Sequence, residues 1–485
     1  MEIHEIRAQR ENKLKSLRDK GIDAFSAPSP DRLPIGEVIK DFKEGSRTTV
    51  SGRIMAKRSH GKVTFVDLRD ATGRIQLYVK ADHIGPEGAL VFQEIDIGDF
   101  ITAFGELFMT HTGEPTMKLE KFSILAKSLM PLPEKWHGLK DVELRYRQRY
   151  LDLISNEEVK SVFKSRCAII RSIRSYLDSH GYLEVETPMM HDIPGGAAGR
   201  PFKTHHNAFD MNLYMRIAPE LYLKRLIVGG LDRVYEINRS FRNEGISTRH
   251  NPEFTMLEAY CAYSNFEGMM DLAEELIVNA AQATGGTTEI VYQGTSISLA
   301  RPWRRVSFAH LVKDKFGIDP SDEPDVMLQK LHDKNVAKDS TKLSRSQVTK
   351  VIEDILEEEI GANPTFVTDF FTSMSPLAKT RKDNPLLSER FELYIAGFEM
   401  GNAYSELNDA LEQKRRFEEE ITELATDEKK SLDEDYCLAL EHGMPATGGL
   451  GIGVDRLVML LTNQPSIRDV ILFPLLKPVE EHHES

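Results

Sequence analysis

The stretch from Arg239 to Tyr263, RSFRNEGISTRHNPEFTMLEAYCAY, restricts the fold of this chain more than any other. It predicts a strand, a polar loop that closes with the turn-favouring pair Asn251-Pro252, and a second, strictly alternating strand. Because a strand repeats every two residues, one face of the second strand carries Phe254, Met256, Glu258 and Tyr260. Such a face, beside a loop with Arg and His, suits an anionic, base-bearing ligand. A hairpin with one hydrated face is the alternative.

Length and composition predict a globular protein of two or more domains. The chain has 485 residues, whereas single hydrophobic cores stop growing at about 250–300 residues. Its 40% hydrophobic and 28% charged residues are typical of a soluble protein. It has no run of about 18 apolar residues, and its charged N-terminal stretch lacks the apolar core of a signal peptide. No membrane partner is therefore expected.

The cysteines and the net charge restrict the cellular compartments and the binding partners that are expected for this chain. Cys167, Cys261 and Cys437 are scattered, which predicts neither a disulfide framework nor a zinc site and fits a reducing cytoplasm. A net charge of −14 argues against a surface that is basic throughout. Residues 1–60 nevertheless carry more Lys and Arg than Asp and Glu, so a local surface there could meet a phosphate backbone. A solvated helix face is the alternative.

The first 130 residues predict a helical lead-in followed by a small β-barrel. Residues 1–45 contain an amphipathic helix and an irregular, Pro-containing stretch. Over residues 46–130, five short strands alternate with Gly-containing breaks, which is typical of the OB-fold. OB-folds bind oligonucleotides through basic and aromatic side chains on one face, and the candidates are Arg58, Phe65 and Gln76. A single Phe in a strand is otherwise most often a core residue.

A linker over residues 131–150 precedes a second, larger domain over residues 151–485. That domain begins with an amphipathic helix over 157–180, which Gly181 ends, and continues with a strand over 182–190. Two of its segments show no identifiable chemistry and are predicted to be structural: a largely helical insertion around residues 305–360, and the adjacent histidines His205 and His206.

A second group of polar residues lies in FELYIAGFEMGNAYSELNDALEQ, residues 391–413. Asn402, Tyr404 and Glu406 alternate along one face of a predicted strand. Two acids, Glu392 and Glu399, precede them. Unpaired buried charge is unfavourable, so carboxylates that converge near Glu258 need cations, with Mg²⁺ and ammonium groups as the natural partners. Clustering of acids on an ordinary surface is the alternative.

The segment GGLGIGVDRLVMLLT, residues 448–462, predicts a Gly-rich strand that leads into a helix near Val454. A dinucleotide-binding fingerprint would need Gly where Arg456 stands, and no Walker motif occurs. The glycines allow a ligand to approach the backbone closely, and Arg456 supplies a cation at the start of the helix.

These segments together resemble the class II aminoacyl-tRNA synthetases. Residues 239–263 are similar to motif 2, the helix and strand over 157–190 to motif 1, and GLGIGVDR to motif 3. The wording FRNEGISTRHNPEFTMLE is that of the bacterial-type lysyl enzymes, and IRDVILFP, residues 467–474, matches the closing strand of the family. The resemblance implies an α+β fold, with an antiparallel catalytic sheet flanked by helices and an N-terminal OB-fold anticodon-binding domain, in a homodimer.

The resemblance also implies site residues. Those for ATP are Arg242, Glu244, His250, Asn251, Phe254 and Arg456, with the two arginines catalytic. Those for lysine are Gly196, Glu220, Glu258, Tyr260, Asn402, Tyr404 and Glu406. Glu392 and Glu399 should ligate Mg²⁺, and Phe65 and Gln76 match positions that face the anticodon.

The implied reaction is the ATP-dependent attachment of L-lysine to tRNA(Lys) through a lysyl-adenylate, with release of AMP and pyrophosphate. The lysine carboxylate is already ionised, so the first step needs positioning and charge neutralisation rather than a protein base or nucleophile. Glu220, Glu258 and Glu406 suit ammonium groups, whereas an aspartyl enzyme needs a cation for its second carboxylate.

Three other functions are considered. An aspartyl- or asparaginyl-type synthetase is disfavoured by the acidic pocket. A relative that transfers lysine to a protein and lacks the anticodon barrel is disfavoured by residues 46–125. A non-catalytic RNA-binding module on a synthetase scaffold would be expected to lack motif arginines or metal carboxylates, and Arg242, Glu392, Glu399 and Arg456 are all present.

Overall fold

The computed structural model describes residues 3–133, 139–197, 199–334, 348, 351–352, 360–423 and 432–478. Of the predicted helical insertion around residues 305–360, residues 335–347, 349–350 and 353–359 lie outside the described residues. The chain divides into two compact units, residues 1–141 with 150–155 and residues 142–149 with 156–485. No helix in the described part of the chain is long and apolar enough to cross a membrane.

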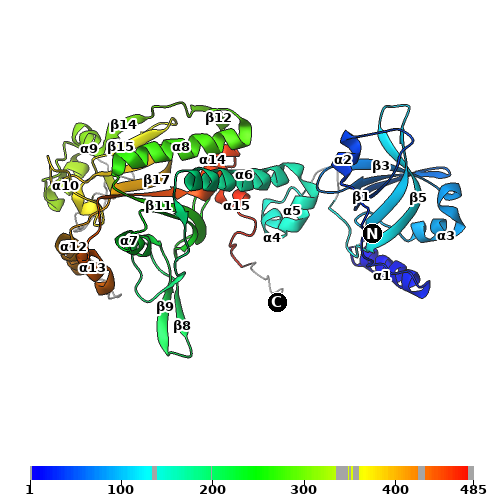
Figure 1. The fold of residues 1–485 in the computed structure, drawn as a ribbon, viewed down its shortest axis with the longest axis horizontal. Helices are drawn as coiled ribbons and strands as arrows, with labels where there is room; N and C mark the ends of the chain where they lie inside the picture. The colour runs from blue at the N-terminus through cyan, green and yellow to red at the C-terminus, as the bar shows by residue number, and fades with distance from the viewer. Residues whose placement is uncertain are drawn as a thin grey trace. The chain divides into compact units, whose positions relative to one another are not determined.

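The N-terminal unit is built on a closed five-stranded barrel with strand order β1-β2-β3-β5-β4, as the sequence predicted (Figure 1). Its elements are α1 (Ile3–Asp19), α2 (Ile35–Lys40), β1 (Arg47–His60), β2 (Val63–Arg69), β3 (Arg74–Lys80), α3 (Ala81–Gln93), β4 (Phe100–Met109) and β5 (Pro115–Ala126). Alternation fills the barrel, because Val66 and Leu68 of β2 are fully buried in its core. The sequence did not reveal α3, since Gly85, Pro86 and Gly88 interrupt its apolar pattern and Gly85 is kinked at φ 74°.

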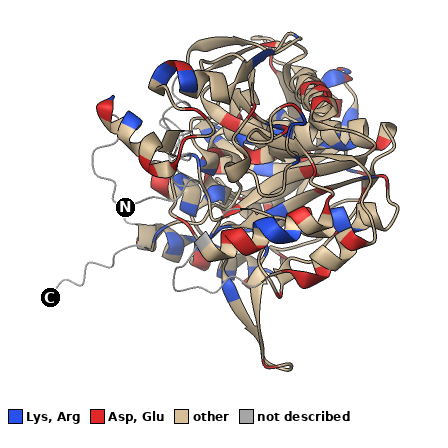
Figure 2. Cartoon of the chain, turned by 90° about the vertical axis from the view of Figure 1, so that its left-hand side faces the viewer, with Lys and Arg blue, Asp and Glu red and all other residues tan. Residues whose placement is uncertain are grey.

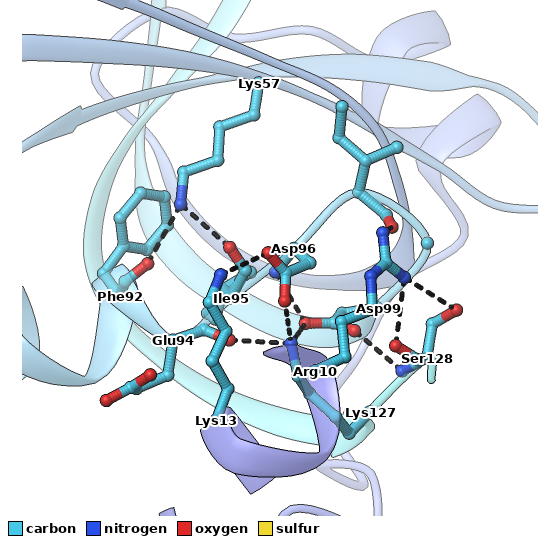
Figure 3. A network of polar contacts seen from close by, with 12 residues as sticks. Arg10, Lys13, Lys57, Phe92, Glu94, Ile95, Asp96, Asp99, Lys127 and Ser128 are labelled. Carbon is cyan, nitrogen blue, oxygen red and sulfur yellow. Dashed lines mark hydrogen bonds and ion pairs between the residues drawn. The ribbon is translucent and has the colours of Figure 1, made fainter. Parts of the chain in front are cut away.

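A buried network of charges joins α1 to the barrel (Figure 3). Lys127 is fully buried, and its Nζ lies 2.6 Å from Asp96 Oδ2 and 2.8 Å from Asp99 Oδ2. Lys13 of α1 reaches the other oxygen of Asp96 at 2.5 Å. Arg10 of α1 donates to the carbonyl oxygens of Ile97, Ser128 and Met130. Each buried charge therefore has an opposite charge or hydrogen-bond acceptors as partners, which is the condition for placing such groups in a core.

The second unit is organised by an eight-stranded sheet with order β14-β15-β16-β17-β18-β11-β10-β6. Its strands are β6 (Leu183–Glu184), β10 (Arg233–Phe241), β11 (Glu253–Ala262), β14 (Arg304–Ser307), β15 (Thr365–Thr368), β16 (Arg390–Ile395), β17 (Phe398–Ser405) and β18 (Thr447–Gly453). All pairs from β15 to β10 are antiparallel, which confirms the predicted antiparallel catalytic sheet. The edge pairs β14–β15 and β10–β6 are parallel.

The two faces of this sheet differ in chemistry. Residues paired across antiparallel strands point to the same side, so Leu257 shares a face with its partner Ile452. Both belong to the main core, which is completed by helices α6 (Glu157–Ser179), α8 (Phe266–Gly285) and α14 (Val454–Leu461). In Figure 1, α6 and α8 run side by side along the sheet. The opposite face carries Glu258 and its partner Gly451, and it holds the polar residues.

The remaining elements lie outside the barrel and the eight-stranded sheet. They are α4 (Val142–Arg147), α5 (Arg149–Ser155), β7 (Met190–His191), β8 (Lys203–His206), β9 (Met211–Met215), α7 (Glu220–Val228), β12 (Glu289–Tyr292), β13 (Thr295–Ser298), α9 (Phe308–Phe316), α10 (Pro324–Asp333), η1 (Thr372–Met374), α12 (Ala410–Glu423), α13 (Glu434–Glu441) and α15 (Ile467–Val470). Basic and acidic residues, blue and red, alternate along the helices that face the viewer in Figure 2. Both signs of charge are therefore mixed on this side of the molecule.

Two local predictions were wrong. The segment 182–190 forms a strand only at Leu183–Glu184, with Met190 starting the short β7. Residues 467–474 contain the short helix α15 instead of a strand, because Ser466 caps it by accepting from the backbone N–H of Arg468.

Candidate functional site

The polar face of the sheet is built on the hairpin β10–β11 and on β18. The predicted alternation is observed, and Glu258 and Tyr260 of β11 lie opposite Gly451 and Gly449 of β18. On the other side of β18, the same two glycines lie opposite Asn402 and Tyr404 of β17. The side chains of β11 and β17 therefore flank a strip of bare backbone in the middle of the sheet. This strip explains why the sequence needs glycines there.

Gly449 illustrates how closely side chains approach this strip. A Cβ atom at this position would lie 1.9 Å from Glu406 Oε1 and 2.6 Å from Tyr260 Cε1. No side chain can occupy that space without displacing both residues. The loop residue Gly196, at φ +86°, has a similar place above the helix α7, since its Cβ would lie 3.2 Å from Glu220 Cβ.

The predicted lysine-binding acids converge around an internal cation. Lys224 of α7 is fully buried, donates from Nζ to Glu220 Oε1 at 2.6 Å, and forms an ion pair with Glu406. Tyr404 donates its hydroxyl to the same Glu220 oxygen at 2.5 Å. Burial by itself would lower the pKa of Lys224, but the carboxylates of Glu220 and Glu406 raise it above its ordinary value. The cluster is thus acidic around one fixed ammonium group.

Buried Glu258 interacts with Glu220 of this cluster, and the group of Glu220, Glu258, Glu406 and Lys224 is called the acidic pocket below. Burial, followed by the nearby charge of Glu220, raises the pKa of Glu258 to about 8. Tyr260 donates its hydroxyl to Glu258 Oε2 at 3.1 Å. Burial raises the pKa of Tyr260 well above its ordinary value, so its hydroxyl remains a donor. Because burial disfavours the ionised form of this carboxyl group, a ligand that brings a positive charge would stabilise that form.

The residues predicted to contact ATP lie around the loop that connects β10 to β11. The Arg242 guanidinium lies 5.1 Å from the centre of the Phe254 ring. Arg456, at the start of α14, donates to the Glu399 main-chain oxygen at 2.5 Å, and its Nη2 lies 3.4 Å from His250 Nε2. Two arginines, an exposed His and an aromatic ring therefore meet here.

Several polar atoms in this region have no partner within the described residues. Arg242 Nε and Asn251 Oδ1 are buried without a hydrogen bond, although Asn251 donates from Nδ2 to the Glu253 oxygen at 2.6 Å. Unpaired buried polar atoms are unfavourable and indicate places for ligand contacts. Burial and the charge of Arg456 lower the pKa of His250, against a smaller opposing effect of the exposed Glu244.

The two carboxylates predicted to ligate Mg²⁺ lie on β16 and β17. A bulge shifts the register between them, so Tyr394 pairs with Glu399 while Glu392 pairs with Asn402, which brings both acids to the polar face. Glu392 is buried, forms an ion pair with Arg390, and accepts from the Tyr394 hydroxyl at 2.6 Å. Within the described residues, no group of three potential metal ligands occurs. Mg²⁺ often binds through one or two carboxylates together with substrate phosphates, and this pair offers that donor set.

The three candidates on the barrel share its outer face. Arg58 lies opposite Phe65, and its guanidinium donates to Asp67. Phe65 contacts Tyr78 edge-on, with ring centres 5.6 Å apart, and Tyr78 contacts Phe108 in the same way at 5.8 Å. Gln76 donates to Glu114 at 3.3 Å. Phe65 is thus one of three neighbouring partly exposed rings and not a residue of the barrel core.

Sequence reasoning missed several residues that contact the candidate residues of the two units or their neighbours. On the barrel these are Tyr78, Phe108 and Glu114. In the second unit the main one is Lys224, although its position four residues after Glu220 on a helix was a usable signal, because such pairs share a helix face. The sequence placed Glu406 in one predicted set with Glu220, but it did not indicate that Lys224 would form an ion pair with both.

Comparison with known proteins gives matches over both units. The family described as class II tRNA synthetases (D, K and N) matches residues 141–477, and an OB-fold nucleic acid binding domain matches residues 48–125. A lysine–tRNA ligase of Carboxydothermus hydrogenoformans is 52% identical over 483 residues, covering 98% of this chain and 99% of that protein. The corresponding ligase of Pelotomaculum thermopropionicum is 52% identical over 487 residues, covering 99% and 96%. That of Moorella thermoacetica is 50% identical over 494 residues, covering 99% of each.

Proposed function

Because this chain belongs to the class II tRNA synthetases and is a lysine–tRNA ligase, we propose that it forms a lysyl-adenylate in the acidic pocket. The observation that carries the proposal is the convergence of Glu220, Glu258 and Glu406 on one buried site. Three carboxylates beside a single internal cation suit a ligand with two ammonium groups. They do not suit aspartate or asparagine, so those alternatives are not favoured.

The nucleotide is proposed to lie beside the hairpin loop. Adenine would stack between Phe254 and the Arg456 guanidinium, an arrangement in which a ring face attracts a cation. Arg242 would neutralise the α-phosphate and the lysine carboxylate, which is supported by its unpaired Nε. Glu244, His250 and Asn251 would contact the rest of the nucleotide. Glu392 and Glu399 would hold Mg²⁺, which neutralises phosphate charge when bound.

The reaction follows from these positions. In the first step a lysine carboxylate oxygen bonds to the α-phosphorus of ATP, and the bond to pyrophosphate breaks. In the second step the 3′-terminal hydroxyl oxygen of tRNA bonds to the lysyl carbonyl carbon, AMP leaves with the electrons of the broken C–O bond, and the hydroxyl proton is released. Arg242 and Arg456 act by holding the reactants in line and by stabilising negative charge, so no covalent enzyme intermediate is needed.

The roles of the domains, the homodimer and the location in the cell are proposed from the family and from the exposed side chains. Residues 46–130 would bind the tRNA anticodon through Arg58, Phe65 and Gln76. Residues 131–150 would form a linker to residues 151–485, which would form the catalytic domain. A homodimer is supported by exposed apolar side chains just after the motif 1 helix, since Leu183, Met189 and Met190 are 52%, 47% and 53% exposed. The enzyme would act in the cytoplasm, because translation there releases the uncharged tRNA that it uses.

The test is ATP–pyrophosphate exchange with the purified full chain and Mg²⁺, with lysine, arginine, aspartate, asparagine or no amino acid. Exchange that depends on lysine alone is expected. Exchange with aspartate or asparagine would mean that the acidic pocket has been misinterpreted. A folded protein without exchange for any amino acid would be a non-catalytic RNA-binding module.

A further inference from the structure

The acidic pocket contains a cationic side chain, Lys224, that has no role in the reaction described above. Lys224 has no exposed side-chain surface, and it bridges Glu220 on its own helix and Glu406 after β17. Its Nζ also lies 5.4 Å from the centre of the Tyr404 ring. From α13, the fully buried Tyr436 faces the same group. Two acids and two phenols thus surround Lys224: Glu220, Glu406, Tyr404 and Tyr436.

The charges in this pocket balance only when Lys224 is counted. Glu220, Glu258 and Glu406 bring three negative charges when ionised, and Lys224 removes one of them. Two negative charges then remain for the ligand, and lysine carries two ammonium groups. Without Lys224 the pocket would hold one unpaired carboxylate. An unpaired buried carboxylate takes up a proton rather than stay charged, and it then no longer attracts an ammonium group.

Geometry gives Lys224 a second effect. Glu406 is anchored by Lys224 on one side, while its other oxygen lies against the backbone of Gly449. Glu220 Oε1 receives both Lys224 and the Tyr404 hydroxyl. These contacts fix the direction of both carboxylates before any ligand arrives, and such preorganisation strengthens binding. Burial raises the pKa of Glu406, and Lys224 is the main group that opposes this rise.

We propose that Lys224 is a positioning residue that selects lysine, by fixing the carboxylates of Glu220 and Glu406 and by matching the pocket charge to two ligand ammonium groups. The proposal rests on the proposed function and deepens it. It assigns part of the amino-acid specificity to a side chain that need not touch the substrate.

The test compares two neutral variants, Lys224→Met and Lys224→Gln, in lysine-dependent ATP–pyrophosphate exchange. Gln retains hydrogen-bond donors for the two carboxylates, so it protects the experiment against misfolding of the Met variant. The KM for lysine is expected to rise at least about tenfold in both, because removal of one partner of a buried charge pair is strongly unfavourable. The KM for ATP should stay within about twofold of the original.

A second measurement separates charge matching from general damage. Norleucine has the shape of lysine without the side-chain ammonium group, so the ratio of its inhibition constant to the lysine KM reports recognition of that charge. The ratio should fall at least about tenfold in both variants. General damage would weaken both ligands alike and leave the ratio unchanged, which would overturn the proposal. Equal rises in the two KM values, or an unchanged lysine KM, would also overturn it.

A matched control exists in the N-terminal unit. Lys127 is equally buried and equally bridges two carboxylates, those of Asp96 and Asp99 (Figure 3). Lys127→Met should leave both KM values of exchange unchanged, because the cluster lies outside the acidic pocket. A similar rise in lysine KM there would contradict the proposal. If the unaltered protein shows no lysine-dependent exchange, the proposed function fails. If the unaltered protein shows this exchange and the Lys224 variants have the same lysine KM, only this inference fails.

Discussion

At the residue scale, burial changes the chemistry of ordinary side chains in the acidic pocket. Glu258 is the clearest case, since burial and the neighbouring Glu220 raise its pKa to about 8. Its carboxyl is therefore mostly protonated in the free protein at neutral pH. The sequence indicates that Glu258 lies on the ligand face, but its protonation state depends on what covers it.

This pKa leads to a prediction about lysine binding. An ammonium group favours the ionised form of Glu258, so lysine should displace a proton at pH 7. Lysine affinity should rise between about pH 6 and 8 and then level off, because above its raised pKa the carboxyl is already ionised. Calorimetry in phosphate and Tris buffers, which have different ionisation enthalpies, measures the released proton. Glu258→Gln should abolish the release, and Glu253→Gln, at an exposed position of the same strand, should retain it. Equal heats in the two buffers would contradict the prediction.

Gly449 carries a prediction about space. The methyl group of Gly449→Ala would meet Glu406 Oε1 and Tyr260, so both must move. A displacement of about 1 Å in an active site can reduce kcat/KM about 100-fold, and we expect a loss of that order for lysine in pyrophosphate exchange, with ATP much less affected. Gly285→Ala, where the new methyl group meets nothing within 4 Å, is the control. Normal kinetics of the Gly449 variant would show that the pocket tolerates displacement.

At the element scale, a buried junction connects α6, β11 and α14. Arg166 of α6 donates to Asp455 Oδ1 at 2.6 Å and to Thr255 Oγ1 at 3.0 Å. The other Asp455 oxygen accepts from the Thr255 backbone N–H at 2.7 Å. Thr255 and Asp455 directly adjoin Phe254 and Arg456, the two residues proposed to hold adenine. The junction therefore fixes the spacing of that pair.

Loss of the junction should affect stability and nucleotide binding together. Arg166→Met leaves Asp455 without its cation, which should lower the free energy of unfolding by about 3–5 kcal/mol and raise the KM for ATP more than that for lysine. Arg174→Met on the same helix removes only an exposed pair with Glu184, for which about 0–1 kcal/mol is expected. Urea unfolding and exchange kinetics provide both measurements. Equal effects of the two substitutions would argue against the junction.

At the scale of the whole molecule, the residues proposed for chemistry and those proposed for tRNA recognition belong to two different compact units. The catalytic sheet and the barrel have separate hydrophobic cores. The rings of Phe65, Tyr78 and Phe108 lie on the barrel, whereas every residue proposed to contact lysine or ATP lies in the second unit. A change on the barrel face should therefore leave adenylate formation intact.

Phe65→Ala tests this separation. Loss of one stacking ring is worth about 1–3 kcal/mol per base, so tRNA charging should become about tenfold less efficient or worse, with unchanged pyrophosphate exchange. Phe25→Ala, at an exposed Phe of the same unit, should affect neither activity. Unchanged charging by the Phe65 variant would remove this ring from anticodon recognition.

Sequence by itself determined the features that depend on local periodicity. The alternation of β11 placed Phe254, Glu258 and Tyr260 on one face, and the Gly-rich strand was predicted to lead into a helix near Val454, where α14 begins. These inferences held because side-chain direction in a strand and the ends of helices are set by neighbouring residues. The barrel was predictable for the same reason, while α3 escaped because its glycines and proline obscure the helical pattern.

Only the tertiary structure decided which charges meet. The pairing of Lys224 with Glu406, the bulge that turns Glu399 toward the face of Glu392, and the contact of Arg166 with Asp455 all join segments that are distant in the chain or depend on strand register. Their energies depend on burial and on distances of a few ångströms, and local sequence specifies neither. The sequence named the acids of the pocket, and packing alone set their protonation and their partners.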